Sequence, residues 1–118
     1  MWWPVRLRAT GYPPAVGRLS RAQLDALVQE ATVDCHDEDE QVTGLYTMIE
    51  DNLAMPFDTT VLGVEVTVEG VDLTDHGHIV AKCKRMAFRQ AIPLLDLPLP
   101  TPAPEGAQWI EAYRHWGR

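Results

Sequence analysis

Apolar residues recur at helical spacing in two segments of the first half of the chain. The first segment covers residues 20–33 and begins at Ser20, a residue type that commonly caps a helix N-terminus. The second runs from about Asp37 to Leu53 and is followed by Pro56, which cannot continue a helix. Its apolar stripe consists of Val42, Leu45, Ile49 and Leu53. The pattern therefore predicts two amphipathic helices.

After Phe57 the hydrophobic period changes to two, which is typical of β-strands. Residues 60–73, 79–86 and 88–95 are strand-like, with a turn at residues 73–79 and a hairpin around Ala87. Glycines in the first of these segments suit bends or a bulge, and they favour a small curved antiparallel sheet or a partly open barrel of the SH3 kind. We expect its buried residues to include Val64, Val66, Val68, Ile79 and Ile92.

The chain ends in a proline-rich link and a third helix. Residues 97–106 carry too many prolines for regular structure, whereas residues 105–116 place Trp109, Ile110, Tyr113 and Trp116 on one helical stripe. The first fourteen residues show no periodicity and are interpreted as an arm. The sequence therefore predicts an α+β fold with two helices before the sheet and one after it. We expect an N-terminal arm and short helix over residues 1–31 and an α+β domain over residues 32–118.

Composition and charge narrow the classes of partner. With 118 residues the chain is long enough for one modest core, and its net charge of -7 argues against nucleic acid and anionic membranes as partners. Cys35 and Cys83 are the only cysteines and form no C-x-x-C pair, as is typical of a reducing compartment. No apolar run reaches ~20 residues and no signal-peptide pattern opens the chain, so we expect a cytoplasmic protein.

Seven carboxylates lie between residues 34 and 51, at the two ends of the second predicted helix. At its start, Asp37 and Glu40 have the spacing of a capping box, and the helix dipole favours first-turn carboxylates by roughly 0.3–1 kcal/mol each. This cluster is explained without a metal ion.

The acids at the other end of this helix are not explained in that way. Glu50 and Asp51 lie in the last turn, where the dipole disfavours negative charge and backbone carbonyls lack intrahelical partners. Carboxylates beside carbonyls suit calcium, and Asp58 is near enough in sequence to complete such a site. Because ten helical residues span roughly 15 Å, one ion cannot join both clusters. Two sites are therefore expected, with Asp34 in the first.

The EF-hand pattern does not account for these acids, because a loop that starts at Asp37 puts Val42 where glycine is required. The chain instead resembles the small CcbP-type calcium-binding proteins first known from cyanobacteria. The resemblance covers roughly residues 32–117 and rests on four segments in order: VDCHDEDEQVTGLYTMIEDNLAMPF, LGVEVTVEGVDL, AIPLLDL and WIEAYRHW.

This resemblance implies a calcium buffer or sensor without enzymatic activity. The acidic motif residues of the family correspond to Asp34, Asp37, Glu40, Glu50 and Asp51. The last helix departs from the family pattern, because Ala112 replaces an expected acid and Tyr113 an expected tryptophan. The resemblance therefore implies no ligand from that helix.

Two other functions compete with calcium binding. A small barrel could act as a protein-interaction module, with the acidic helix serving only solubility. Separately, the cations Lys82, Lys84, Arg85 and Arg89 are interpreted as an exposed strand face, or alternatively as a surface that pairs with the acidic helix of another copy. The segment with Asp72, Asp75, His76 and His78 has ligands for a transition metal and so for a metal-assisted hydrolase, although a hairpin turn explains the same residues.

Overall fold

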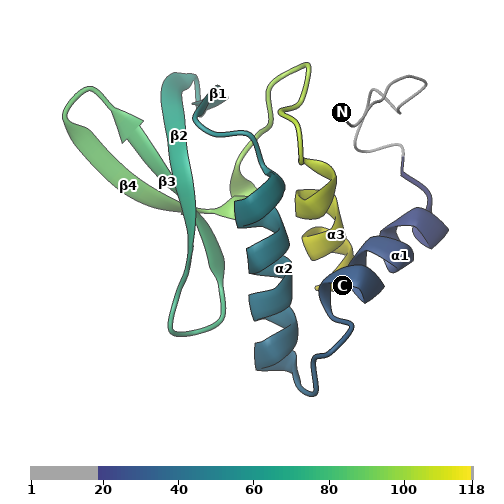
Figure 1. The fold of residues 1–118 in the computed structure, drawn as a ribbon. Coiled ribbons are helices and arrows are strands. Elements are labelled where there is room, and N and C mark those ends of the chain that lie inside the picture. The colour runs from purple at the N-terminus through teal and green to yellow at the C-terminus, as the bar shows by residue number, and fades with distance from the viewer. Residues whose placement is uncertain (1–18, 118) are drawn as a thin grey trace.

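Helices and sheet occupy separate parts of the molecule (Figure 1). The computed structural model describes residues 19–117, so the arm expected over the first fourteen residues lies outside the described part. Within it, three α-helices and a four-stranded sheet follow in the predicted order, but a turn at Leu62 and Gly63 divides the first predicted strand, residues 60–73, between two strands. The helices are α1 (Arg21–Ala31), α2 (Glu38–Asn52) and α3 (Gln108–Trp116), and the strands are β1 (Phe57–Val61), β2 (Val64–Leu73), β3 (Ile79–Arg85) and β4 (Phe88–Pro93).

The helix starts agree with the capping residues in the sequence. The hydroxyl of Ser20 accepts a hydrogen bond from the Gln23 amide, and the Gln23 side chain accepts one from the Ser20 amide, which completes a capping box for α1. Asp37 caps α2 by accepting from the Glu40 amide. Each cap satisfies an amide that would otherwise lack a partner at the helix start.

The sheet is an antiparallel meander in the order β1-β2-β3-β4. Leu62 and Gly63 form the tight turn between β1 and β2 with φ values of 51° and 79°, as two-residue hairpins of the primed turn types require. A bulge between Val68 and Gly70 shifts the register of β2 against β3. Because of that extra residue, the next core residue after Val68 is Val71 rather than residue 70.

The predicted α+β class with a small antiparallel sheet is confirmed, and within residues 19–117 the four strands form an open sheet and not a closed barrel. Val68 and Ile79 are buried as expected, and Val66 and Ile92 are half-buried. The prediction for Val64 is wrong, because it is 39% exposed. It directly follows the β1–β2 turn, at the end of the sheet that α2 does not cover. The third predicted strand also ends early, because Leu94–Asp96 form a 3-10 turn (η2).

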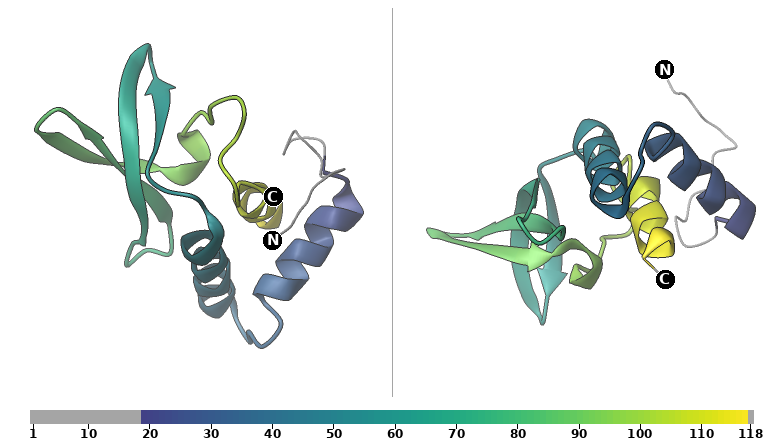
Figure 2. Two further views of the ribbon diagram at one scale, coloured as in Figure 1. Left: turned by 45° about the horizontal axis from the view of Figure 1, so that its top comes forward. Right: turned by 90° about the horizontal axis from the view of Figure 1, so that it is seen from below.

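The core lies between the sheet and the helices. Figure 2 shows α2 beside the sheet and α3 between α2 and α1. The largest fully buried side chains come from the helices, the sheet and η2: Leu45, Ile49, Val68, Ile79, Leu94 and Ile110. Among residues 19–117, no helix is long and apolar enough to cross a membrane.

The C-terminal end of α2 is held by the loop that precedes α3. The Ala54 amide donates to the Glu105 carbonyl over 2.8 Å. Gly106, with φ +90°, lies so close to the last residue of α2 that an added Cβ would be 2.1 Å from the carbonyl oxygen of Asn52. This packing therefore holds the C-terminal end of α2 in place, with Glu50 and Asp51 exposed.

Candidate calcium site

The N-terminal end of α2 gathers carboxylates around a network of backbone amides. The Oδ1 atom of Asp37 accepts from the Glu40 amide over 2.9 Å, and Oε1 of Glu40 accepts from the His36 amide over 2.6 Å. The expected capping box is therefore modified, because the Glu40 side chain reaches one residue further back than the cap residue. Each of these carboxylates uses one oxygen in this way, which leaves its second oxygen as a potential cation ligand.

Four carboxylates border one open hollow at this end of the helix. It measures about 510 Å³, and its acidic lining residues are Asp34, Asp37, Asp39 and Glu40. Asp34 thus lies beside the first cluster, as the sequence suggested. Asp39 also lines the hollow, although it was not among the ligands expected from the sequence. The sequence offered no separate reason to select it, because a carboxylate in the first turn of a helix is already favoured by the helix dipole.

Cys35 lies in the same hollow and responds to its electrostatic field. Desolvation raises the pKa of the Cys35 thiol above its ordinary value, and the negative charges of Glu40, Asp34 and Asp37 raise it further. The thiol also donates a hydrogen bond to the Glu40 carbonyl over 3.2 Å. Both effects favour the protonated thiol, so Cys35 reports the concentration of negative charge here.

The C-terminal end of α2 contains Glu50 and Asp51 with different surroundings. The hydroxyl of Tyr46 donates to Oε2 of Glu50 over 2.9 Å and also approaches the Val71 carbonyl at 3.4 Å. Desolvation of Tyr46, followed by its hydrogen bond to Glu50, raises the pKa of the phenol. Asp51 is exposed, and no basic residue occupies the last turn. The unfavourable dipole interaction predicted for this end is therefore present in the structure.

Asp58 is engaged by its neighbouring strand. It lies on β1 opposite Thr67 of β2, and its Oδ1 accepts from the Thr67 hydroxyl over 2.7 Å. With Glu65 and the segment 98–100 it borders a separate shallow hollow. This arrangement gives Asp58 a local partner without any ion.

Within residues 19–117, no three His, Cys, Asp or Glu side chains already converge closely enough to hold a metal ion. The donors at the start of α2 nevertheless fit calcium in kind, because they are hard carboxylate oxygens on exposed side chains beside an open hollow. Binding would require these side chains to turn toward a common centre, which their exposure permits.

The segment that follows Asp72 and contains two histidines is a turn between β2 and β3. The Thr74 amide donates to the His78 carbonyl, the Gly77 amide to the Thr74 carbonyl, and the His78 amide to the Thr74 hydroxyl. Oδ1 of Asp72 accepts from the neighbouring Leu73 amide. These contacts support the hairpin-turn interpretation, and this segment contributes no three-residue metal cluster in the described part of the chain.

Comparison with known proteins identifies similar chains. The family model Calci_bind_CcbP, described as "Calcium binding", matches residues 25–117. The crystal structure of Anabaena CcbP superposes with a TM-score of 0.69 at 18% identity, covering 84% of this chain and 93% of that one. A calcium binding protein in its calcium-binding form has a TM-score of 0.65 at 18% identity and covers 86% and 92%. A search of curated proteins gives no match. At this identity the structural likeness establishes a shared fold.

Proposed function

The chain belongs to the CcbP family of calcium-binding proteins, and we propose that it binds Ca²⁺ at both ends of α2 as a cytoplasmic buffer or sensor. The first site would use Asp34, Asp37 and Glu40, and the second Glu50, Asp51 and Asp58. The observation that carries the proposal is the hollow at the start of α2, which Asp34, Asp37, Asp39 and Glu40 line together. Four carboxylates around one open space form a cation-attracting surface.

The two ends differ in how strongly the fold itself requires their acids. At the N-terminal end, capping and the helix dipole stabilise negative charge without calcium. At the C-terminal end, the dipole opposes it, and Tyr46 offsets this for Glu50 alone. A bound cation would remove the remaining repulsion there. We therefore expect calcium to stabilise the C-terminal end of α2 relative to its calcium-free state.

The proposed role is binding and not catalysis. Calcium would supply a positive charge that draws carboxylates together, and the chain supplies oxygen ligands of the kind that calcium prefers. The two cysteines give no sign of nucleophile activation, because burial raises the pKa of the Cys83 thiol and both desolvation and nearby acids raise that of Cys35.

A titration of the purified chain with calcium in a magnesium background tests this proposal. We expect amide shifts at residues 34–40 and 50–52 and a rise in melting temperature. Binding to the native state alone stabilises by about 2.7 kcal/mol at a hundredfold excess over Kd. Shifts confined to one end would reduce the proposal to one site. An unchanged melting temperature between chelator and millimolar calcium would refute it.

A further inference from the structure

The β3–β4 hairpin has a charge opposite to that of the whole chain. Residues 79–93 contain Lys82, Lys84, Arg85 and Arg89 and no carboxylate, although the chain carries a net charge of -7. The acids of the sheet lie on the other two strands, at Asp58, Glu65, Glu69 and Asp72. Positive charge therefore lies on β3 and β4 and negative charge on β1 and β2, so the β4 side of the sheet attracts anions.

Strand β4 also presents an unpaired edge. It lies at the end of the strand order and pairs only with β3 among the described residues. Arg85 and Phe88 close the two-residue turn of the hairpin, so they form its first hydrogen-bonded pair. Hydrogen-bonded and non-hydrogen-bonded pairs alternate along an antiparallel ladder, so the backbone N–H and C=O groups of Arg89 and Ala91 point away from β3. Pro93 also belongs to this outward-pointing set, and its lack of an N–H costs no hydrogen bond there.

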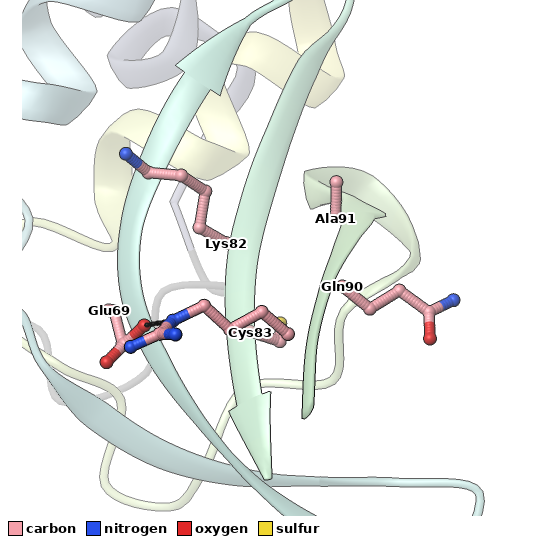
Figure 3. A pocket seen from close by; sticks show the side chains of 6 residues that line it. Glu69, Lys82, Cys83, Gln90 and Ala91 are labelled. Atoms are coloured by element: carbon pink, nitrogen blue, oxygen red, sulfur yellow. Dashed lines mark hydrogen bonds and ion pairs between the residues drawn. The ribbon is translucent and has the colours of Figure 1, made fainter. Parts of the chain in front are cut away.

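A hollow of about 440 Å³ lies next to this edge and extends across the sheet to β2 (Figure 3). Its lining residues are Glu69, Lys82, Cys83, Arg89, Gln90 and Ala91. Cε of Lys82 lies over Gly70 of β2, where an added Cβ would be 3.2 Å from it, so the Lys82 side chain borders the hollow on the side of β2 (Figure 3). Arg89 pairs with Glu69 over 3.3 Å, but the two side chains are 68% and 38% exposed. An ion pair this exposed contributes little, so a carboxylate from another molecule can compete for Arg89.

Apolar side chains accompany these cations at the tip of the hairpin. Met86 and Phe88 are each 78% exposed, and the tip projects away from the helices (Figure 1). Because side chains alternate along a strand, Phe88 lies on the opposite face of β4 from Arg89. A strand added at this edge would therefore meet a cation on one face and an aromatic ring on the other.

We propose that the β4 edge binds an extended acidic segment of a partner protein, which adds to the sheet as a fifth strand. Its backbone pairs with Arg89 and Ala91, its carboxylates contact Arg89 and the nearby Lys82 and Lys84, and its alternate apolar residues contact Phe88. This mode of recognition obtains affinity from main-chain hydrogen bonds and specificity from alternate side chains. It is independent of calcium binding at α2.

Two other occupants fit this edge less well. Pairing of β4 with β4 of a second copy would bring together two hairpins that each carry four cations and no carboxylate, and like charges on neighbouring strands are destabilising. An anionic membrane would contact the cations and Phe88 but offers no backbone partner for Ala91, and the chain's net charge opposes its approach.

The test measures binding of a fluorescent synthetic peptide to the full chain in chelator. The peptide alternates glutamate with valine. We expect saturable binding that weakens with salt, and no binding of the matched lysine–valine peptide. The variants K82A and R89A should each weaken binding about two- to fivefold, the effect of one exposed ion pair. E69Q should tighten binding by a similar factor because it releases Arg89, a gain that loss of folding cannot produce.

The variant A91P separates backbone pairing from charge. It removes the outward N–H of residue 91 and leaves the bonds between β3 and β4 in place, so it should abolish binding while the melting temperature stays near that of the parent. Full binding by A91P, or no binding of the acidic peptide up to about 1 mM, would overturn the proposal. Calcium-independent binding to phosphatidylserine vesicles that requires Phe88 but not the Ala91 N–H would replace the proposal with membrane binding. Self-association that R89A strengthens and A91P abolishes would replace it with pairing between two copies.

Discussion

The indole N–H of Trp116 donates a 2.8 Å hydrogen bond to the side-chain oxygen of Gln41. This contact joins the last residue of α3 to the first turn of α2, one residue after Glu40. The aromatic ring of Tyr113 stacks near Trp116, with ring centroids 6.3 Å apart. Trp116 of α3 is therefore close enough to the proposed first calcium site for its surroundings to change when Glu40 moves.

This contact predicts an optical signal of calcium binding. Calcium should change the tryptophan emission, because movement of Glu40 would alter the polarity around the neighbouring Gln41–Trp116 pair. The variant W116F should lose most of this change, whereas W109F should keep it, since Trp109 is a core residue. An equal calcium-dependent change in W116F would show that this pair is not the reporter.

Asp37 should prove to have two separable roles. D37A removes the cap of α2 and should lower the free energy of unfolding by about 0.5–2 kcal/mol in chelator. D37N keeps a good capping side chain and removes only the charge, so its stability in chelator should be close to that of the parent. Both variants should weaken calcium binding at this end. Unimpaired calcium binding by D37N, measured by calorimetry, would exclude Asp37 as a ligand.

The opposite pattern is expected at the other end of α2. In E50Q/D51N, the hydroxyl of Tyr46 keeps an oxygen acceptor at residue 50 while the unfavourable interaction of two negative charges with the helix C-terminus is removed. Denaturant unfolding in chelator should therefore show no loss of stability. The calcium-dependent amide shifts near residue 50 should disappear, and if they persist this end is not a binding site.

The packing at Gly106 should make α2 sensitive to a remote substitution. G106A places a methyl group against the carbonyl of Asn52 at a residue with φ +90°, and should cost more than about 2 kcal/mol. The matched control is G63A, where φ is +79° and no atom lies within 4 Å of the added group, so that only the backbone cost of about 1–2 kcal/mol applies. Equal melting temperatures for the two variants would contradict this packing.

Cys35 should report calcium through its reactivity. Desolvation and then Glu40, Asp34 and Asp37 raise the pKa of this thiol, so little thiolate is present at neutral pH in chelator. A bound calcium ion would offset the negative charges and lower the pKa, which moves the pH profile of alkylation toward lower pH. Cys83 is the internal control because it is buried and lies away from the acidic hollow. An unchanged Cys35 profile would argue against an ion in this hollow.

The order of elements and the two caps followed from local sequence. Ser20 and Asp37 lie at helix starts because their short oxygen-bearing side chains satisfy backbone amides within three residues, so no distant contact is needed to predict them. The change of hydrophobic period at Phe57 identified the sheet for the same reason. The family resemblance also rested on the order of local motifs. The match of the calcium-binding family model to residues 25–117 confirms this resemblance.

Burial of individual strand residues could not be obtained in this way. The alternation of apolar and polar residues predicts that Val64 and Val68 lie on the same buried face of β2. Val68 is fully buried but Val64 is exposed, because α2 covers only one end of the sheet (Figure 1). Likewise, the sequence could not show that the β4 edge remains unpaired in the described fold, since barrel closure depends on strand curvature and on distant contacts.

The sequence by itself determined which side chains could attract a cation and at which helix ends they lie, because charge and helical spacing are local properties. Only the tertiary structure decided which of them share a space. The turn between α1 and α2 brings Asp34 to the hollow with Asp37 and Asp39, and strand pairing assigns Asp58 to Thr67. Proximity between residues of different elements is set by how the elements pack, and neither composition nor period encodes that packing residue by residue.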